Sequence, residues 1–339
     1  MPTEQELLLE GIHNWENIKE DYKNPHLLLG NGFSMQFSEN FAYSSLFSLF
    51  LENCNEQYRD LFNQFGTTNF ELIQKYLNYT IKVNTVLGLP TQPVIDALEN
   101  LKNGLIRTIE QVHPRAENIN FESLDIVAEK LREFQNIFTT NYDLYLYHII
   151  MLSYDKHTRD RTYEPYQDWF WGRHNAPDGF REFMDYQNRP FKHIYYLHGS
   201  LFLFKHGLYD IKLVKGDSGT ELIEDISHQI RGNNFPLFVS EGTGPQKEER
   251  IQENSYLRFC LENLENSEGP FLIFGNVMGE FDSHILKALK KQDRPIIYSI
   301  YTLNRTINEI NLEKLNFLSK FNNYGEEVKF VNSSTVFGL

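Results

Sequence analysis

The chain has 339 residues, and its 46 acidic and 32 basic side chains give a formal net charge of −14 at pH 7. Such an acidic chain argues against direct nucleic-acid binding through phosphate contacts, because that mode of binding requires a cationic face. Apolar residues make up 41% and charged residues 23% of the sequence, which excludes a disordered chain.

The two cysteines, Cys54 and Cys260, lie far apart in the sequence. They exclude a zinc ribbon and a disulfide framework, and such sparse use of cysteine is typical of a reducing compartment. The acidic N-terminus lacks the basic start and the apolar run of a signal peptide. The longest apolar runs have about five or six residues, too few to cross a bilayer. We therefore expect a cytoplasmic protein without a membrane partner.

Short apolar runs alternate with helical patterns along the chain. Runs without polar alternation are typical of parallel strands that are covered on both faces. We expect strands at 26–30, 136–141, 193–199, 235–240, 270–275, 295–301 and 328–332. Apolar residues spaced three and four apart predict helices over 98–112, 144–151, 257–264 and 285–289. This alternation predicts an α/β fold with a Rossmann-like, doubly wound, mostly parallel sheet.

Two long connections interrupt the alternation within what we interpret as one domain, 1–339. Residues 41–131 follow helical patterns almost throughout, which predicts a large helical insertion. Its phenylalanines either fill the core of the insertion or form a contact surface for self-assembly; they are Phe41, Phe47, Phe50, Phe62, Phe65 and Phe70. Residues 155–190 are rich in aromatic side chains but show little periodicity, so we expect a long, ordered aromatic loop near the site.

Glycines and polar residues follow four of the expected strands, and ligands of open α/β sheets bind beyond the carboxyl ends of strands. After the first strand, the segment Gly30-Asn31-Gly32-Phe33-Ser34 is either a tight turn or a loop whose backbone N–H groups bind phosphates. After the second, Thr140-Asn141-Tyr142-Asp143 opens a helical pattern. Its Asn141 and Asp143 either cap that helix or hold a ribose hydroxyl and a water.

The third and fourth strand ends carry histidines. His198 ends the 193–199 run, where it is either a structural residue or a general base poised near neutral pH. After Gly275, Asp282 and His284 lie at the start of the next helical pattern, where helix capping and surface solvation explain them most simply. No pair of cysteines or histidines has the spacing of metal ligands, so we expect no metal.

The order of these motifs resembles that of the sirtuin superfamily and is most similar to the bacterial sirtuin-like proteins of antiphage defence. In those proteins a Thr-Thr-Asn-Tyr-Asp segment and a Leu-His-Gly segment flank an NAD pocket, and both segments occur here. The resemblance covers about 26–300. The four zinc-binding cysteines of sirtuin deacylases are missing, the Gln of their Gln-Asn-Ile-Asp segment is absent, and Gly275-Asn276-Val277 replaces their Gly-Thr-Ser. The resemblance therefore implies a reaction of NAD itself rather than deacylation.

The family implies an NAD+ glycohydrolase that cleaves the nicotinamide–ribose bond and depletes NAD in antiphage defence. It assigns catalysis to Asn141, His198 and Asp143, and binding of the NAD substrate to Gly30, Asn31, Gly32, Ser34, Thr140, Gly275, Asn276 and Asp282. We expect activation by homo-oligomerisation or by a partner such as an ATPase or a phage-sensing protein. The alternatives are a non-catalytic module that senses NAD or another nucleotide, and an ADP-ribosyltransferase.

Overall fold

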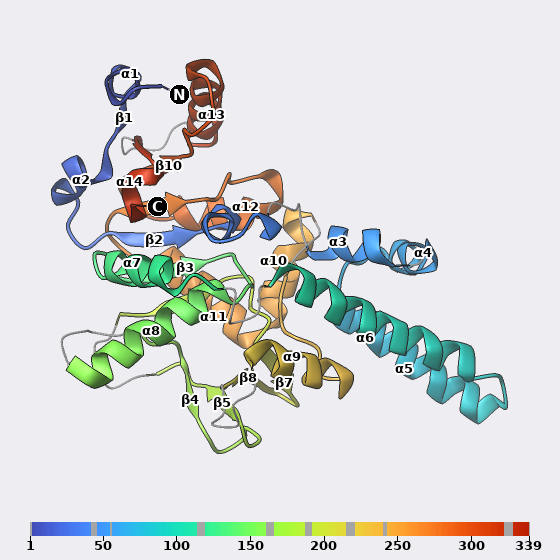
Figure 1. Cartoon of the computed structure of the whole chain (residues 1–339). Helices are drawn as coiled ribbons and strands as arrows, with labels where there is room; N and C mark the ends of the chain where they lie inside the picture. The colour runs from blue at the N-terminus through green and yellow to red at the C-terminus, as the bar shows by residue number, and fades with distance from the viewer. Residues whose placement is uncertain are drawn as a thin grey trace.

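A parallel sheet forms the centre of the protein (Figure 1). The computed structural model describes residues 2–41, 46–54, 56–113, 119–160, 166–186, 192–214, 221–239, 243–321 and 328–338. All pairings in its seven-stranded sheet are parallel. The spatial order is β1 (Ile12–His13), β11 (Val328–Asn332), β10 (Ile296–Ile300), β9 (Phe271–Phe274), β2 (His26–Leu29), β3 (Ile137–Thr139) and β6 (Ile194–Tyr196). The predicted Rossmann-like α/β fold is confirmed.

The order of the strands places a topological switch point beside β2. From β2 the chain adds β3 and β6 on one side, and it later adds β9, β10 and β11 on the other. Every residue of β2 and β9 is buried, as expected for strands covered on both faces. Ligands of doubly wound sheets bind beyond the strand ends at such a point, which here lies between the loops after β2 and β9.

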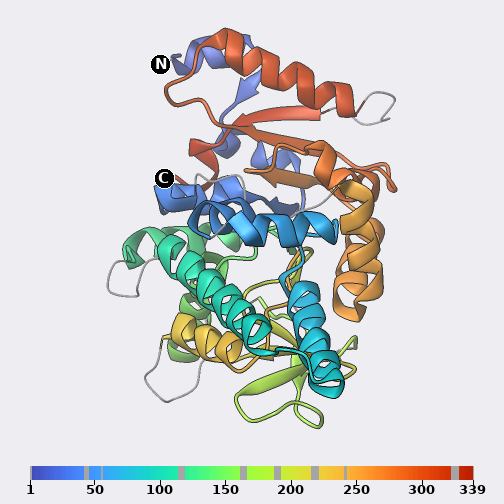
Figure 2. The same cartoon turned by 90° about the vertical axis from the view of Figure 1, so that its right-hand side faces the viewer.

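Helices flank the sheet on both sides, and several begin at polar caps (Figures 1 and 2). Asn120, Asn254 and Thr306 each accept a backbone N–H from the first turn of the following helix, a donor that the helix itself leaves unpaired. Helices outside the 41–112 region are α1 (Glu4–Leu9), α2 (Trp15–Ile18), α7 (Phe121–Leu131), α8 (Tyr145–Asp160), α9 (Leu222–Arg231), α10 (Gly244–Glu253), α11 (Ser255–Asn266), α12 (Ser283–Leu289), α13 (Ile307–Lys320) and α14 (Ser334–Phe337). Short 3-10 helices are η1 (Lys19–Asp21), η2 (Asn31–Gln36), η3 (Glu39–Phe41) and η5 (Glu280–Asp282).

The predicted helical insertion 41–131 has two parts. The larger part, called the arm below, comprises α3 (Leu46–Asn53), α4 (Glu56–Gln64), α5 (Phe70–Leu87) and α6 (Gln92–Val112). The α5–α6 hairpin extends away from the sheet (Figure 1), and Gly88 ends α5 with a left-handed φ of 68°. In contrast, α7 packs against α8 and α14. The second part therefore belongs to the layers around the sheet.

Most phenylalanines of the insertion lie inside the protein. Phe47, Phe50, Phe62 and Phe70 are buried, and the ring centroids of Phe50 and Phe70 are 4.9 Å apart. Phe65 is 50% exposed and is the exception among the six phenylalanines singled out from the sequence. Burial of the other five supports the interpretation that they fill a core, because aromatic rings contribute most when they pack edge to face in the interior.

The prediction of a long loop over 155–190 is wrong for the described part of that segment. Residues up to Asp160 continue α8, and the segment then supplies β4 (Phe170–Gly172) and β5 (Phe180–Phe183). These pair with β8 (Tyr209–Leu213) and β7 (Leu203–His206) in a four-stranded antiparallel sheet. The strands have three or four residues each in this segment, too few to show a period, and β5 pairs with a strand nearly thirty residues downstream. Residues 161–165 and 187–191 lie outside the described residues.

The expected strand at 235–240 is also wrong. Phe238 makes only an isolated antiparallel bridge with Gly199. Pro236 has no N–H to donate to a ladder, so the segment cannot pair as a regular inner strand. Residue 240 lies outside the described residues.

In the described part of the chain, no helix combines the length and the apolar character that are needed to cross a membrane.

Candidate functional site

Glycines bring the loops after β2 and β9 into direct backbone contact at the switch point. The Gly30 N–H donates to the Phe274 carbonyl and the Gly32 N–H to the Gly275 carbonyl, each over 2.9 Å. A Cβ at Gly30 would lie 2.5 Å from the Asn276 Cβ, and one at Gly32 would lie 2.7 Å from the Gly275 Cα. Gly275 itself has a φ of 66°, a conformation that only glycine adopts readily.

Hydrogen bonds within the protein reduce the number of N–H groups that the loop after β2 could offer to a phosphate. The N–H groups of Gly30, Gly32 and Phe33 are already bonded to backbone carbonyls, and the Asn31 side-chain amide donates to the Phe41 carbonyl over 2.9 Å. The loop leads into the 3-10 helix η2, not into an α-helix. Close packing at Gly30 and Gly32 agrees with the tight-turn alternative of the sequence, and binding of NAD by Gly30, Asn31 and Gly32 stays a prediction.

Ser34, Asn141 and Asp143 form a buried hydrogen-bonded cluster. The Asn141 amide donates to Ser34 Oγ over 2.9 Å, and the Ser34 hydroxyl donates to Asp143 Oδ2 over 2.5 Å. Asp143 Oδ1 accepts the N–H of Tyr145, the first residue of α8, over 2.9 Å. Asp143 thus caps the helix, whereas Asn141 reaches back to the loop after β2.

Burial sets the electrostatics of this cluster. It raises the pKa of Asp143 above its ordinary value, although the hydrogen bonds from Ser34 and Tyr145 oppose the shift. A neighbouring positive charge would lower this pKa again. Burial therefore favours the protonated, neutral form of the Asp143 carboxyl group unless a positive charge lies beside it.

Thr140 and Asn276 connect the loop after β3 to the loop after β9. The Asn276 amide donates to Thr140 Oγ1 over 3.2 Å, and Asn276 Oδ1 accepts the Met278 N–H over 2.7 Å. Thr140 in turn donates its backbone N–H to the Leu29 carbonyl over 2.9 Å. The pair therefore holds the ends of β2, β3 and β9 in fixed relation.

His198 and His284 face each other across the strand ends. The two Nε2 atoms are 2.9 Å apart, and both side chains are buried. His198 follows β6, and His284 lies in α12, which follows β9. β2 and β3 separate β6 from β9, so the loop after β6 and the segment after β9 together bring His198 and His284 into contact beyond the ends of the two strands between them.

The expectation that His284 is a solvated surface residue is wrong, since only 2% of it is exposed. Asp282 occupies the N-cap position of α12 but makes no side-chain cap hydrogen bond. Its Oδ1 instead accepts from Lys247 Nζ at 3.1 Å and lies 4.0 Å from His198 Nε2. The Asp282 carboxylate therefore binds Lys247 of α10 and does not cap its own helix, α12.

Burial keeps both imidazoles neutral at physiological pH. It holds the pKa of His198 well below its ordinary value and lowers the pKa of His284 to about 4. Burial alone would raise the pKa of Asp282, but His198 and Lys247 together hold it below its ordinary value. His198 therefore lacks the pKa near neutral pH that the general-base alternative of the sequence required. It is a neutral imidazole beside an ionised carboxylate.

The structure brings Asn141 and His198 to neighbouring strand ends. Thr139 pairs with Tyr196 in the parallel register of β3 and β6, and each functional residue follows two positions later. Ser200 Oγ donates to the Tyr142 carbonyl over 3.1 Å and ties the two loops together. Among the described residues, no hydrogen bond joins the Asn141 cluster to the His198 cluster.

Lys247 is the member of the site that sequence reasoning missed. It lies in α10, only 7% exposed, and no motif marks it. His198, Asp282 and His284 also offer three metal-ligating atoms within 4.8 Å of one another. Sequence spacing excluded such a group because 86 residues separate the two histidines.

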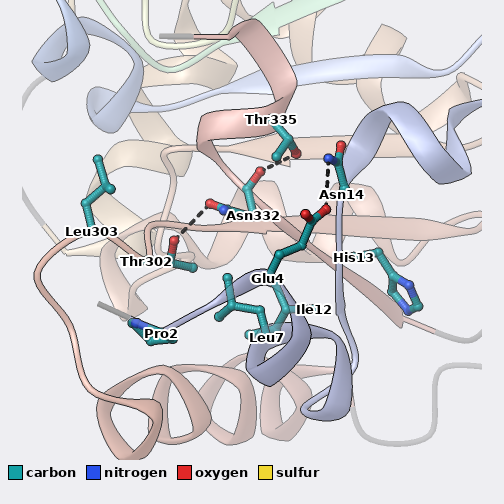
Figure 3. A pocket seen from close by; sticks show the side chains of 10 residues that line it. All are labelled: Pro2, Glu4, Leu7, Ile12, His13, Asn14, Thr302, Leu303, Asn332 and Thr335. Atoms are coloured by element: carbon teal, nitrogen blue, oxygen red, sulfur yellow. Dashed lines mark hydrogen bonds between the residues drawn. The ribbon is translucent and has the colours of Figure 1, made fainter.

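A cavity of about 250 Å³ lies elsewhere in the molecule, at the carboxyl ends of β1, β10 and β11 (Figure 3). Its polar side chains are largely paired with one another. Thr302 Oγ1 donates to Asn332 Oδ1 over 3.0 Å, and the Asn14 amide donates to Glu4 over 3.3 Å. None of its lining residues belongs to the predicted site.

Residues 27–336 match the family model described as "Domain of unknown function (DUF4917)". The match covers most of the chain, so the protein belongs to this family. A search of curated proteins found no match.

Proposed function

We propose that this DUF4917 protein is an NAD+ glycohydrolase whose reaction takes place above the carboxyl ends of β2, β3 and β6. One observation carries the proposal. Asn141 and His198 follow paired positions of adjacent parallel strands, beside the switch point where β2 and β9 meet. Ligands of this sheet architecture bind there. The motif order that resembles sirtuin-like proteins supports NAD as the ligand.

The proposed reaction breaks the bond between ribose C1′ and the nicotinamide nitrogen and joins a water oxygen to C1′. Nicotinamide leaves as a neutral molecule, so its departure needs no general acid. Positive charge develops on the ribose, as in other glycosyl transfers. Water gives up one proton as it adds, and a neutral imidazole is the form that accepts one.

Each residue then has a distinct task. Asn141 can donate and accept hydrogen bonds and holds a ribose hydroxyl or the attacking water. Asp143 offsets positive charge on the ribose, which would also favour its ionised form. His198 accepts the proton, and the nearby Asp282 carboxylate stabilises the imidazolium that results.

The direct test measures nicotinamide release from NAD by purified protein and by its Asn141→Ala and His198→Ala variants. We expect His198→Ala to lose roughly 10²–10⁴-fold in turnover, the usual contribution of a positioned acid–base group, and Asn141→Ala to lose roughly 10²–10³-fold, the usual cost of removing one positioned hydrogen-bond donor. His228→Ala is the matched control, because His228 is an exposed histidine of α9. Undiminished turnover in both site variants would refute the assignment. Circular dichroism confirms that the variants are folded.

The same assay separates the alternative functions. An ADP-ribosyltransferase would leave labelled adenine on a macromolecule, whereas hydrolysis releases free ADP-ribose. A sensing module would bind NAD without turnover.

The biological setting is part of the proposal and rests on the resemblance to antiphage-defence proteins. We propose that the enzyme acts in the cytoplasm and becomes active on self-assembly or with a partner such as an ATPase or a phage-sensing protein. The apolar tip of the arm supports such an encounter, since Val86 is 85% and Leu87 64% exposed. Cells expressing the His198→Ala variant should lose both NAD depletion and protection during phage infection.

A further inference from the structure

The contact between His198 and His284 has the geometry of two metal ligands. Their Nε2 atoms point at each other across 2.9 Å, and the ring planes are inclined by 35°. A Zn²⁺–N bond is about 2.0–2.1 Å long. Two such nitrogens on one ion lie about 2.9 Å apart at a right angle and about 3.4 Å apart at a tetrahedral angle. The observed separation matches the lower end of this range.

We propose that His198, His284 and Asp282 bind a divalent transition-metal ion of the zinc class. The three ligand atoms come from the loop after β6 and from the chain entering α12, and they lie within 4.8 Å of one another. Two imidazoles and one carboxylate are a common donor set for Zn²⁺ and for related ions. Three protein ligands leave at least one coordination position open.

Asp282 is the ligand that must move. Its Oδ1 is 4.0 Å from His198 Nε2, farther than two ligands on one ion in tetrahedral or octahedral cis positions. The side chain is 21% exposed and makes no cap hydrogen bond, so a rotation toward the imidazoles breaks no cap. Lys247, now 3.1 Å from Asp282 Oδ1, competes with the ion for the carboxylate.

The donor chemistry selects the ion. Buried neutral imidazoles offer nitrogen lone pairs, which suit Zn²⁺, Co²⁺ or Ni²⁺. Mg²⁺ and Ca²⁺ prefer oxygen ligands, and this cluster supplies only one carboxylate. An excess of Mg²⁺ should therefore fail to displace the transition metal.

Metal binding has a regulatory consequence that rests on the proposed glycohydrolase activity. In the hydrogen-bonded pair, one of the two imidazoles carries its proton on Nε2. Both Nε2 lone pairs must be free to bind the ion, so this proton moves to Nδ1 of the same ring. The ion then occupies the Nε2 lone pair of His198. A metal-bound His198 cannot accept a proton at Nε2. Zn²⁺ should therefore inhibit nicotinamide release, and a chelator should restore it.

The test titrates the purified, chelator-treated full-length protein with Co²⁺ and follows its visible absorption bands. We expect the parent protein to bind one equivalent of Co²⁺. In both His284→Gln and Asp282→Asn, the affinity for Co²⁺ should fall by about tenfold or more. The control His228→Gln changes an exposed histidine and should bind like the parent. Asp282→Asn alters a partly exposed side chain, so it tests the site even if His284→Gln fails to fold.

Three outcomes overturn the metal site: no Co²⁺ bands, bands that both site variants retain, or displacement of Co²⁺ by Mg²⁺. The absorption readout does not depend on NAD turnover. Co²⁺ binding in a protein that releases no nicotinamide would uphold the metal site and refute the glycohydrolase. Full turnover with the site saturated by Zn²⁺ would refute the regulatory consequence.

Discussion

Individual buried polar residues determine what the site can do. The Ser34 hydroxyl joins Asn141 to Asp143, and all three side chains are at most 7% exposed. A buried carboxyl group that loses a hydrogen-bond donor keeps the cost of its desolvation without compensation. The orientation of the proposed catalytic amide thus depends on a serine that contacts it from another strand end.

We predict that Ser34→Ala destabilises the protein by about 1–3 kcal/mol, the usual effect of leaving a buried polar partner unsatisfied. Urea unfolding followed by circular dichroism measures the change. Ser319→Ala is the control, because that hydroxyl bonds the Asn316 carbonyl at an exposed position. Equal changes in the free energy of unfolding in the two variants would contradict the prediction.

A second residue-scale prediction concerns acid stability. Burial lowers the pKa of His113 from 6.5 to about 4. A histidine whose folded pKa is depressed contributes stability above its unfolded pKa, and this contribution is lost as the pH falls from about 6.5 toward 4. At pH 5 the loss amounts to about 2 kcal/mol.

His113→Leu should therefore lessen the difference in unfolding free energy between pH 7.5 and pH 5. Urea titrations at the two pH values measure it. Replacing His228 with Leu is the comparison, because this substitution also removes one imidazole but at an exposed position of α9. An unchanged pH dependence in His113→Leu would contradict the prediction.

At the scale of elements, the site exists because two loops approach closely. Gly30, Gly32 and Gly275 occupy the contact between the loops after β2 and β9, and any side chain there would meet backbone atoms. Beyond this contact, the segment from Gly275 leads to His284, whose Nε2 contacts Nε2 of His198. The site therefore depends on loop geometry as much as on the strands.

Gly275→Ala tests this dependence. A Cβ at this position would lie 2.6 Å from the Phe33 N atom, and the φ of 66° disfavours alanine. We expect a loss of about 2 kcal/mol or more, because left-handed backbone alone costs about 1–2 kcal/mol for an L residue. Gly279→Ala, in the same loop, is the control: no atom lies within 4 Å of its added Cβ and its φ is negative. Thermal unfolding should separate the two variants clearly.

At the scale of the whole molecule, the arm is the feature that the sheet does not explain. The α5–α6 hairpin extends away from the sheet (Figure 1), and its tip exposes Val83, Val86, Leu87 and Leu89. Exposed apolar side chains that lie together are common on surfaces that bind another molecule. The proposed activation by assembly places that contact here.

We predict that Val86→Glu shifts the protein toward a smaller species in sedimentation velocity and lowers nicotinamide release in parallel. Leu208→Glu serves as the control, because Leu208 is 88% exposed and belongs to the turn between β7 and β8, which is not part of the arm. A parent protein that sediments as a monomer with full activity would rule out activation by self-assembly.

The sequence predicted six of the seven strands of the parallel sheet and missed β1, which has only two residues. Unbroken apolar runs such as 270–275 can be buried only between helical layers, so their length and order predicted the fold class. The polar residues at strand ends, among them Asn141 and His198, were found for the same reason, since parallel strands present their carboxyl ends at one edge. NAD as their ligand stays a prediction.

Only the tertiary structure decided which of these residues meet. The pairing of β5 with β8, the burial of His284 against His198 and the contact of Lys247 with Asp282 join segments 29 to 86 residues apart. No local period or cap records such contacts, because their free energy comes from packing between elements and not from the conformation of either segment. The sequence predicted which polar side chains follow the strands, and the packing of the loops after β6 and β9 with α10 and α12 determined which of these side chains are in contact.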